Sequence, residues 1–481
     1  MSGILGYATY LPYYRLKRGA IAAMLGGPPA KGTRAVASYD EDSTSMAVAA
    51  TRRLLAHLPG DLAALYFTTT TPAYLDKTNA TAVHAALGLP AQVGAYDMGG
   101  AVRSAVGLLV STLASTRPAL VVAADIRTGL PGSEDERDGG DGAAAFLVGP
   151  GSEAHPVLAE CVATGSATGE FLERWRVPGE AFSRRWEDRF GVHAFLPHVG
   201  RAVATALAGA GIAPDAVDHL IVTGTHPRAA AAFARLSRAK PEVLVNDLTA
   251  TVGNTGAAHP GVLLASALDA ARPGAVIALV VLADGADVAV FRATPALAEH
   301  RSAPSVAEQT AAGREVAYPD FLTWRGMLTR QGPRRPDPAH PAAPPALRSE
   351  AWKFGFTATR CRNCGTRHLP PQRVCAGCGT TDQMAPERLA DVPGTIATFT
   401  VDRLAYSLSP PVVAAVVDFD GGGRYRCELT DVDPAAVAIG SRVEMTFRRL
   451  FTAGGVHNYF WKARLIEDGA AAPAAAGPQG A

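Results

Sequence analysis

The sequence predicts an α/β fold built of stacked layers, followed by a small cysteine-rich module and a small β-barrel. Three features carry this prediction. Over the first 295 residues, short apolar runs alternate with Ala- and Leu-rich amphipathic stretches, as in folds that bury sheets between helices. Four cysteines then fall within the eighteen residues 361–378. Beyond them, five short β-rich segments separated by Gly- and Asp-containing turns are typical of a small barrel.

The α/β region divides into two parts with the same alternation. In residues 1–165, buried strands are expected at 62–69 and 120–124, and helices at 45–58, 78–87 and 101–113. The pattern recurs in residues 166–295, with helices expected at 199–208, 229–236 and 261–271 and strands at 220–222 and 276–282. We therefore predict two similar halves, although no repeat is visible residue by residue.

A proline-rich region follows the second half. Residues 296–350 include RQGPRRPDPAHPAAPPALRSE and are predicted to form an extended linker, because prolines at this density disfavour helix and sheet. Within this linker, residues 318–324 are apolar enough to dock on a neighbouring surface. The cysteine-rich module is expected at 351–385 and the barrel at 386–468. The low-complexity residues 469–481 are expected to be disordered.

Composition argues against several classes of function. The formal net charge is +1, so neither nucleic acid nor an anionic membrane is expected as a partner. The best candidate for a membrane span, 276–282, is far shorter than the roughly 20 apolar residues a span requires. The opening MSGILGYATYLPYYRLKR lacks the unbroken apolar stretch of a signal peptide. Clustered cysteines indicate a reducing compartment, the cytoplasm, rather than a disulfide framework.

The cysteine spacing predicts a zinc site. Cys361-x2-Cys364-x10-Cys375-x2-Cys378 places four thiolates at the ends of two short loops, which suits tetrahedral zinc. Four sulfur ligands leave no open position for water, so the zinc is expected to be structural. The alternatives are two unconnected thiol pairs or a redox dithiol. His368, between the two pairs, is not needed as a ligand and is expected at the surface.

Seven segments of the first 295 residues also carry a resemblance to a known family. They are, in order, GILGYATYLPYYRLKR, DEDSTSMAVAATRRLL, LDKTNATAVHAALGLP, VVAADIRTG, GGDGAAAFLVG, THPR and VGNTGAAHPG. Together they resemble the 3-hydroxy-3-methylglutaryl-CoA (HMG-CoA) synthase branch of the thiolase superfamily. The resemblance implies a five-layer αβαβα fold, a homodimer and a coenzyme A thioester as substrate. From 352 to about 466 the chain resembles the zinc-ribbon/OB-fold family that partners such enzymes, here fused to its partner.

The same resemblance implies a Cys–His–Asn catalytic site. Carried over by position, the histidine is His226 and the asparagine is Asn254. Such a pair holds a thioester carbonyl and stabilises the enolate or oxyanion that forms on it. Two alternatives stay open. Thr225 could be the aligned residue in place of His226, and Asn254 within Gly-Asn-Thr-Gly could be a turn residue only.

The nucleophilic cysteine of that family is missing. It opens a buried helix, and Val102 (or Ala101, with a one-residue shift) stands in its place. Neither side chain can form an acyl-enzyme. Ser104 is a poor substitute, because two residues along a helix rotate a side chain by about 200°. Where the family carries a general-base glutamate, residues 68–71 offer only threonine hydroxyls.

Three hypotheses follow. The first is an acyl-CoA-dependent enzyme, a lyase or a condensing enzyme, with a biosynthetic role. It forms or cleaves a C–C bond by aldol or Claisen chemistry, without an acyl-enzyme. The second is a catalytically silent acyl-CoA-binding or scaffold subunit of a thiolase-type complex. The third is direct transfer of an acyl group from CoA, as an acyltransferase. Nucleic-acid binding by the barrel is not expected, because acidic residues such as Asp418 and Glu428 balance Arg448 and Lys462.

Overall fold

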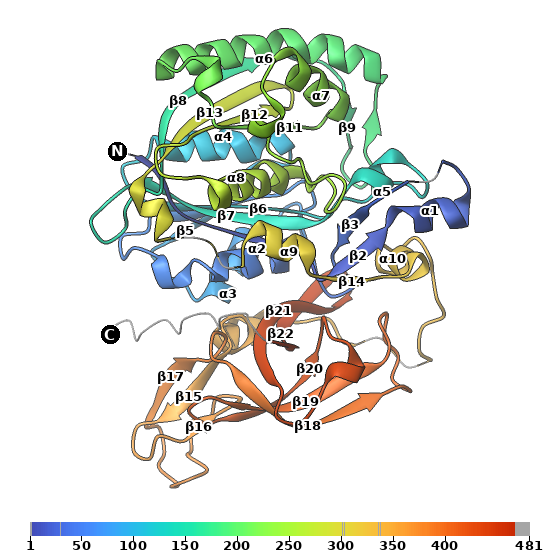
Figure 1. Cartoon of the computed structure of the whole chain (residues 1–481). Helices are drawn as coiled ribbons and strands as arrows, with labels where there is room; N and C mark the ends of the chain where they lie inside the picture. The colour runs from blue at the N-terminus through green and yellow to red at the C-terminus, as the bar shows by residue number, and fades with distance from the viewer. Residues whose placement is uncertain are drawn as a thin grey trace. The chain divides into compact units, whose positions relative to one another are not determined.

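The computed structural model describes residues 2–466 except 29, 301, 303, 335 and 337, and it divides into two compact units (Figure 1). Unit 1 comprises Met1–Ala37, His57–Ala80 and Ala91–Tyr318. Unit 2 comprises Ser38–Ala56, Thr81–Pro90 and the chain from Pro319 onward. Two early segments of the sequence therefore fold with the C-terminal part. The predicted tail at 469–481 lies outside the described residues.

Unit 1 contains a nine-stranded sheet in the order β11-β12-β13-β8-β1-β7-β6-β4-β5. Its strands are β1 (Ser2–Tyr10), β4 (Ala64–Thr68), β5 (Gly94–Asp97), β6 (Ala119–Asp125), β7 (Gly142–Pro150), β8 (Ala159–Thr168), β11 (His219–Gly224), β12 (Val276–Leu282) and β13 (Gly285–Ala293).

The sheet is built of two halves with the same pairing pattern. β1, β7, β6 and β4 pair antiparallel, antiparallel and parallel, and β8, β13, β12 and β11 repeat that sequence of pairings. β5 adds a further parallel strand to the first half, and an isolated parallel bridge between Leu220 and Leu244 takes that place in the second. The halves join where β1 pairs with β8. The predicted similarity of the two halves is confirmed in topology, though not in sequence.

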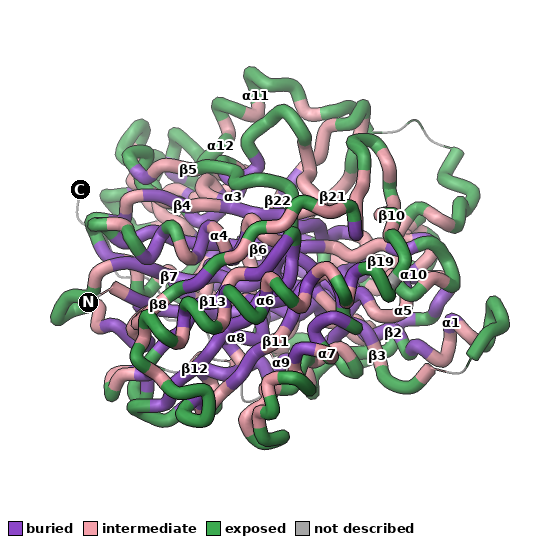
Figure 2. The backbone as a smooth tube through the Cα atoms, turned by 90° about the horizontal axis from the view of Figure 1, so that it is seen from above, coloured by how far each residue is buried: buried purple, intermediate pink, exposed green. Residues whose placement is uncertain are grey.

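Helices form layers on both sides of the second half. α4 (Val102–Leu113) and α8 (His259–Ala270) contribute to one buried core, and α6 (Asp188–Ala210) and α7 (Pro227–Leu236) to another. β12 separates them, because alternate residues of a strand face opposite sides. Ile277, Leu279 and Val281 belong to the first core, whereas Val276, Ala278 and Val280 belong to the second. Figure 1 shows the resulting layers, and Figure 2 shows the buried central strands in purple.

The remaining elements of unit 1 lie around this core. A three-stranded sheet combines β2 (Tyr14–Lys17), β3 (Thr33–Val36) and β14 (Arg314–Glu315), and a small hairpin pairs β9 (Arg174–Trp175) with β10 (Arg184–Arg185). The short helices are α1 (Arg18–Leu25), α5 (Glu134–Asp138) and α9 (Val306–Ala311). α2 (Ser43–Arg52) and nearly all of α3 (Ala80–Leu87) are grouped with unit 2.

Unit 2 carries the predicted cysteine-rich module and barrel. β15 (Thr357–Cys361), β16 (Arg367–His368) and β17 (Met384–Arg388) form a three-stranded sheet. β18 (Gly394–Asp402), β19 (Val412–Phe419), β20 (Arg424–Leu429), β22 (Val456–Leu465) and β21 (Arg442–Ala453) close a barrel in that order. All five predicted β-rich segments are therefore strands of one barrel.

The predicted extended linker at 296–350 is not free of helix. α9, α10 (Tyr318–Trp324), α11 (Ala343–Arg348) and α12 (Glu350–Lys353) all fall within or overlap it. The prolines do not prevent this, because proline is tolerated in the first turn of a helix, where its missing N–H has no intrahelical partner. Pro344 and Pro345 open α11 in this way, and Pro319 is the second residue of α10.

Three smaller predictions also need correction. His368 is buried and is not at the surface, because it lies in β16, where it pairs with Thr359 of β15. The helix predicted at 45–58 ends at Arg52. The helix predicted at 199–208 begins much earlier, at Asp188, and contains Pro197.

A cluster of buried charges binds the early segment Ser38–Ala56 to the barrel. The Arg448 cluster consists of Asp40, Glu41, Asp431, Arg448 and Lys462, all of them buried. Arg448 Nη1 lies 2.9 Å from Glu41 and 3.4 Å from Asp40, and its Nη2 pairs with Asp431. Lys462 Nζ lies 3.0 Å from Asp40. Because these acids and bases come from both parts of the chain, the barrel and this segment form one folded unit.

Among the described helices, none combines the length and the apolar character needed to cross a membrane.

Candidate active site and metal centre

Val102, the residue that the sequence places at the nucleophile position, opens α4. Val102 is the first residue of the helix and Ala101 its N-cap, with extended backbone (φ −112°, ψ 154°). A cysteine here would have its thiolate stabilised by the helix N-terminus. Val102 offers only a branched aliphatic side chain, which is 9% exposed. Ser104 does not replace it: a Cβ built on Gly99 would lie 2.5 Å from its Oγ, so this hydroxyl lies against Gly99.

His226 caps the start of α7. Its Nδ1 accepts a hydrogen bond from the backbone N–H of Ala229 at 3.0 Å. A neutral imidazole with an accepting Nδ1 carries its proton on Nε2, so Nε2–H is a donor. The ring is buried beside Phe195 at a centroid distance of 5.9 Å, and a Cβ on Gly191 would lie 2.4 Å from Nε2. Glycine at 191 therefore leaves the room that Nε2 occupies.

Asn254 reaches the same strand end. Its Nδ2 donates to the carbonyl of Gly224 at 3.1 Å, and its Oδ1 accepts from the N–H of Gly256 at 2.9 Å. Gly224 is the last residue of β11, two residues before His226. The structure thus brings both sequence-predicted residues to one end of β11. Asn254 is also a turn residue, as the alternative reading held, and one of its two amide hydrogens is engaged.

Asp125 organises the loops around this strand end, and the sequence analysis missed it. It is completely buried at the end of β6. Its Oδ1 accepts from Thr69 Oγ1 (2.9 Å), from the N–H of Thr70 (2.6 Å) and from Thr71 Oγ1 (3.4 Å). Its Oδ2 accepts from Thr70 Oγ1 (2.9 Å) and from the N–H of Ala257 (2.7 Å). One carboxylate therefore holds both the threonine loop and the asparagine loop.

Arginines near this site are paired. Arg127 Nη1 donates to Thr70 Oγ1 at 3.1 Å, and burial lowers the pKa of its guanidinium to about 10. Arg174 makes a two-pronged contact with Asp135 at 2.9 and 2.8 Å. Arg103, directly after Val102, pairs with Asp287 at 2.7 Å. These contacts fix the loops that carry the site.

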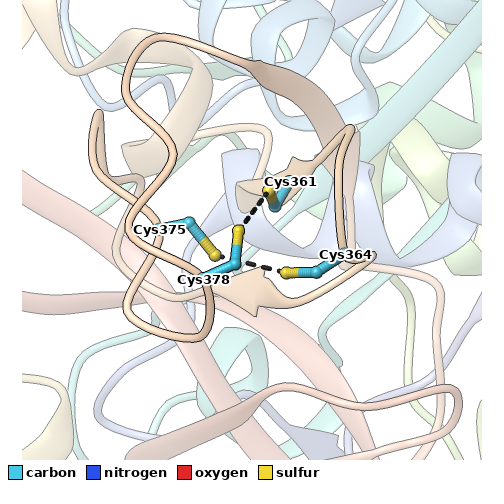
Figure 3. Close-up of side chains that lie close together, drawn as sticks. All are labelled: Cys361, Cys364, Cys375 and Cys378. Carbon is cyan, nitrogen blue, oxygen red and sulfur yellow. Dashed lines mark hydrogen bonds between the residues drawn. The ribbon is translucent and has the colours of Figure 1, made fainter.

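The four predicted metal ligands lie together in unit 2. The Sγ atoms of Cys361, Cys364, Cys375 and Cys378 all lie within 4.8 Å of one another (Figure 3). Cys361 and Cys378 are 3.7 Å apart, and Cys364 and Cys375 3.4 Å. Tetrahedral zinc with sulfur ligands at about 2.3 Å requires S···S separations of roughly 3.8 Å. The four cysteines fit zinc, which would crosslink the two loops of the module and supply no open position for chemistry.

The two cysteine loops have the same geometry. The N–H of Gly365 donates to the carbonyl of Cys361 at 2.9 Å, and the N–H of Gly379 donates to that of Cys375 at 2.9 Å. Both glycines have positive φ, 77° and 72°, a conformation that glycine adopts without steric cost. The sequence repeat Cys-x-x-Cys-Gly-Thr is therefore a repeat in structure.

A threonine accompanies the outer sulfur of each loop. Thr366 Oγ1 lies 3.1 Å from the Sγ of Cys364, and Thr380 Oγ1 lies 3.2 Å from that of Cys378. Hydrogen bonds from Thr380 and Asn363 lower the pKa of the Cys378 thiol to about 5. The thiolate is the form that binds metal, so these contacts favour ligation.

Comparison with known families agrees with the C-terminal architecture. Residues 355–383 match the family model "ChsH2, rubredoxin-like zinc ribbon domain", and residues 387–448 match "ChsH2, C-terminal OB-fold domain". The module is therefore a zinc ribbon, and the barrel is an OB-fold.

The N-terminal part is similar to HMG-CoA synthases. The chain is 29% identical over 349 residues to that of Methanothermobacter thermautotrophicus, covering 68% of this chain and 99% of the relative. It is 28% identical over 351 residues to that of Methanopyrus kandleri, covering 68% and 97%. A structure of "MvaS in complex with 3-hydroxy-3-methylglutaryl coenzyme A" superposes with a TM-score of 0.56 at 20% identity, covering 70% of this chain and 94% of that one.

Fold and comparisons define the class: a thiolase-like α/β protein with a C-terminal zinc ribbon and OB-fold. The relatives named above, to which its N-terminal part is similar, are HMG-CoA synthases.

Proposed function

We propose that the protein forms or cleaves a C–C bond next to the thioester of an acyl-CoA, by aldol or Claisen chemistry without an acyl-enzyme. The observation that carries this proposal is Val102 at the first position of α4. Acyl transfer through the enzyme needs a nucleophile there, and an aliphatic side chain cannot supply one. Stabilising an enolate does not need that nucleophile.

The donors of the proposed site are His226 and Asn254. A thioester oxygen that becomes an enolate oxygen gains negative charge, and donors already fixed in place stabilise it most. The imidazole of His226 and the amide of Asn254 lie at one end of β11, and they are the two donors that we assign to this oxygen. Asp125 supports them by holding the asparagine loop through Ala257.

The other partners follow from the same reading. Coenzyme A thioesters are the proposed substrates, and zinc is a structural cofactor of the ribbon. β5 is the last strand of the sheet order, and exposed Tyr96 and Met98 lie on and beside it, which supports a homodimer through this edge. The six cysteines, all within the described residues, form no disulfide, which supports a reducing compartment, the cytoplasm. A biosynthetic role is part of the proposal.

The test is product analysis with a panel of acyl-CoAs and 3-hydroxyacyl-CoAs, offered with small aldehydes and ketones, by mass spectrometry. The wild type should convert at least one substrate and show no stable acyl adduct in its intact mass. Asn254→Ala and His226→Asn should each lower the rate by about 10²-fold, as the loss of an oxyanion donor does.

Two design features separate chemistry from folding. His226→Asn keeps a good N-cap for α7 while removing the imidazole Nε2. Asn246→Ala is the matched control for Asn254→Ala, because Asn246 makes the same 2.9 Å contact with a backbone N–H two residues on, at an exposed position. Acyl-CoA binding without turnover in the wild type would instead favour the silent subunit. A stoichiometric acyl adduct would favour covalent catalysis and overturn the proposal.

A further inference from the structure

A second carboxylate, Glu173, is buried close to the proposed donors. It lies in the segment 169–187 between β8 and α6, directly before β9, and is 5% exposed. Its carbonyl accepts from the N–H of Trp186 at 2.8 Å, and its own N–H donates to the carbonyl of Phe171 at 3.1 Å. The backbone of Glu173 is therefore fixed on both sides.

The side chain of Glu173 reaches the strand end that carries the histidine. The hydroxyl of Thr225, the residue directly before His226, is a neighbour of its carboxyl group and lowers its pKa. Phe171 packs edge-on against Phe195 at 4.9 Å, and Phe195 packs against the His226 ring. The segment that carries Glu173 therefore packs against the residues around His226.

The same segment also reaches the threonine loop. Arg176, three residues beyond Glu173, donates to the carbonyl of Thr70. Thr70 is held by Asp125, which also holds the asparagine loop through Ala257. Residues 173–176 therefore span from the histidine to the threonine loop. The threonine loop is where the resembling family carries its general-base glutamate, and this sequence has threonine hydroxyls there instead.

The surroundings of Glu173 differ from those of Asp125. Five donors reach the two oxygens of Asp125, so both oxygens are engaged in fixing the loops. Glu173 has the hydroxyl of Thr225 as a neighbour and Arg185 at 3.9 Å. Burial raises the pKa of Glu173, Asp284 raises it further, and Arg185, Arg174 and Thr225 offset part of that increase. A carboxylate whose pKa is raised is a better proton acceptor than an ordinary glutamate once it is ionised, which suits a proton-transfer group.

We propose that Glu173 is the proton-transfer group of this site, an inference that rests on the function proposed above. In the cleavage direction, the Glu173 carboxylate takes the proton of the β-hydroxyl group. The oxygen then forms a carbonyl, the Cα–Cβ bond breaks, and its electron pair passes to the thioester enolate held by His226 and Asn254. Protonated Glu173 returns its proton to Cα, which leaves an acyl-CoA and an aldehyde or ketone. The synthetic direction reverses these steps.

The test is exchange of the Cα protons of acetyl-CoA and butyryl-CoA in D2O, followed by mass spectrometry. Exchange needs the enolate and the base, and no second substrate. We expect the wild type to exchange and Glu173→Gln to lose about 10²- to 10⁴-fold in rate, as loss of a general base does. Glu173→Asp should recover part of the activity. Exposed Glu187, whose side chain makes no capping contact on α6, gives the matched control Glu187→Gln, which should behave as the wild type.

The outcomes separate the two proposals. Exchange at the wild-type rate in folded Glu173→Gln would overturn the role of Glu173 and leave the proposed function standing. No exchange and no turnover in the wild type would overturn the proposed function itself. If Glu173→Gln fails to fold, the wild-type pH profile decides: the exchange rate should rise with pH through a value above 4.5, the ordinary pKa of a glutamate, and level off. A rate independent of pH in that interval would overturn the assignment.

Discussion

The Arg448 cluster in unit 2 and Glu173 in unit 1 are two solutions to burying a carboxylate. Burial alone would raise the pKa of Asp40, but Lys462 and Arg448 beside it hold that pKa well below its usual range. For Glu173 the effect of burial is the larger one, so its pKa is raised, although Arg185 at 3.9 Å and Arg174 offset part of that increase. The carboxylate matched by two close cations serves the fold. The carboxylate with a raised pKa is the one to which we assign proton transfer.

The largest expected effect concerns the predicted zinc site of the ribbon. We expect Cys361→Ser combined with Cys364→Ser to abolish zinc binding and unfold the ribbon, because metal binding to such sites supplies about 10–16 kcal/mol of apparent folding free energy. Metal analysis of the purified wild type should find about one zinc per chain. Limited proteolysis should then cut the variant within 355–388. A wild type that is fully folded without zinc would contradict the assignment.

The next effect breaks the Arg448 cluster. Arg448→Met leaves Asp40, Glu41 and Asp431 without their shared cation and should lower the free energy of unfolding by about 3–5 kcal/mol. Thermal melting of the full chain measures this. Arg424→Met is the control in the same barrel, since Arg424 and Asp418 form an exposed pair that water and salt screen, so its loss should change the melting temperature little. Equal melting temperatures for both variants would show that the Arg448 cluster does not stabilise the fold.

A smaller effect is expected at the outer sulfur of the zinc ribbon. Thr380→Ala removes the hydroxyl 3.2 Å from Cys378 and should lower zinc affinity by about 10- to 100-fold, as the loss of a contact to a metal ligand does. Competition with a chromogenic chelator measures it. The neighbour Thr381→Ala is exposed and should leave the affinity unchanged. Identical zinc release from both variants would show that the threonine contact has no effect on the metal.

The smallest expected effect is a difference between Glu173 and Asp40 in how each residue's contribution to stability changes with pH. The folded-state pKa of Glu173 is raised, so its stabilising contribution is complete below the unfolded pKa and is lost as pH rises through the folded pKa. Asp40 behaves oppositely, because its folded-state pKa is depressed: its contribution is present above the ordinary value of 3.8 and is lost on acidification.

Urea unfolding at a series of pH values measures both slopes. The stability of the wild type relative to Glu173→Gln should fall as pH rises above 4.5, by about 1.4 kcal/mol for each unit of the pKa shift. Relative to Asp40→Asn it should fall as pH drops below 3.8. The same sign for both residues would show that the two environments do not differ as described.

Local patterns predicted much of the fold. The apolar run at 276–282 is β12 to the residue, and the helix predicted at 101–113 is α4 apart from its cap. Both succeeded because a buried strand and an amphipathic helix leave a signature in adjacent residues. The linker failed because a count of prolines ignores their position, and Pro344 and Pro345 occupy the one turn of a helix that accepts them.

The site was predicted less completely. Asn254 and His226 stand in recognisable motifs, and the structure brings them to one strand end, while their roles stay predictions. Asp125 and Glu173 carry no local signal. Asp125 is defined by donors 54–132 residues away in sequence, and Glu173 by Thr225 and Arg185 in a segment without regular periodicity. Contacts of this kind follow from the fold and cannot be read from neighbouring residues.

The pairing of Asp40 with Arg448 also sets an order of events during synthesis. The two residues are 408 positions apart, and a ribosome adds about 5–20 residues per second. Asp40 therefore emerges roughly 20–80 seconds before the cation that neutralises it. Throughout that interval, residues 38–56 must stay hydrated or be shielded by a chaperone, because their acidic side chains have no buried place to occupy. Residues 38–56 can therefore finish folding only after the last strands, β21 and β22, have been synthesised.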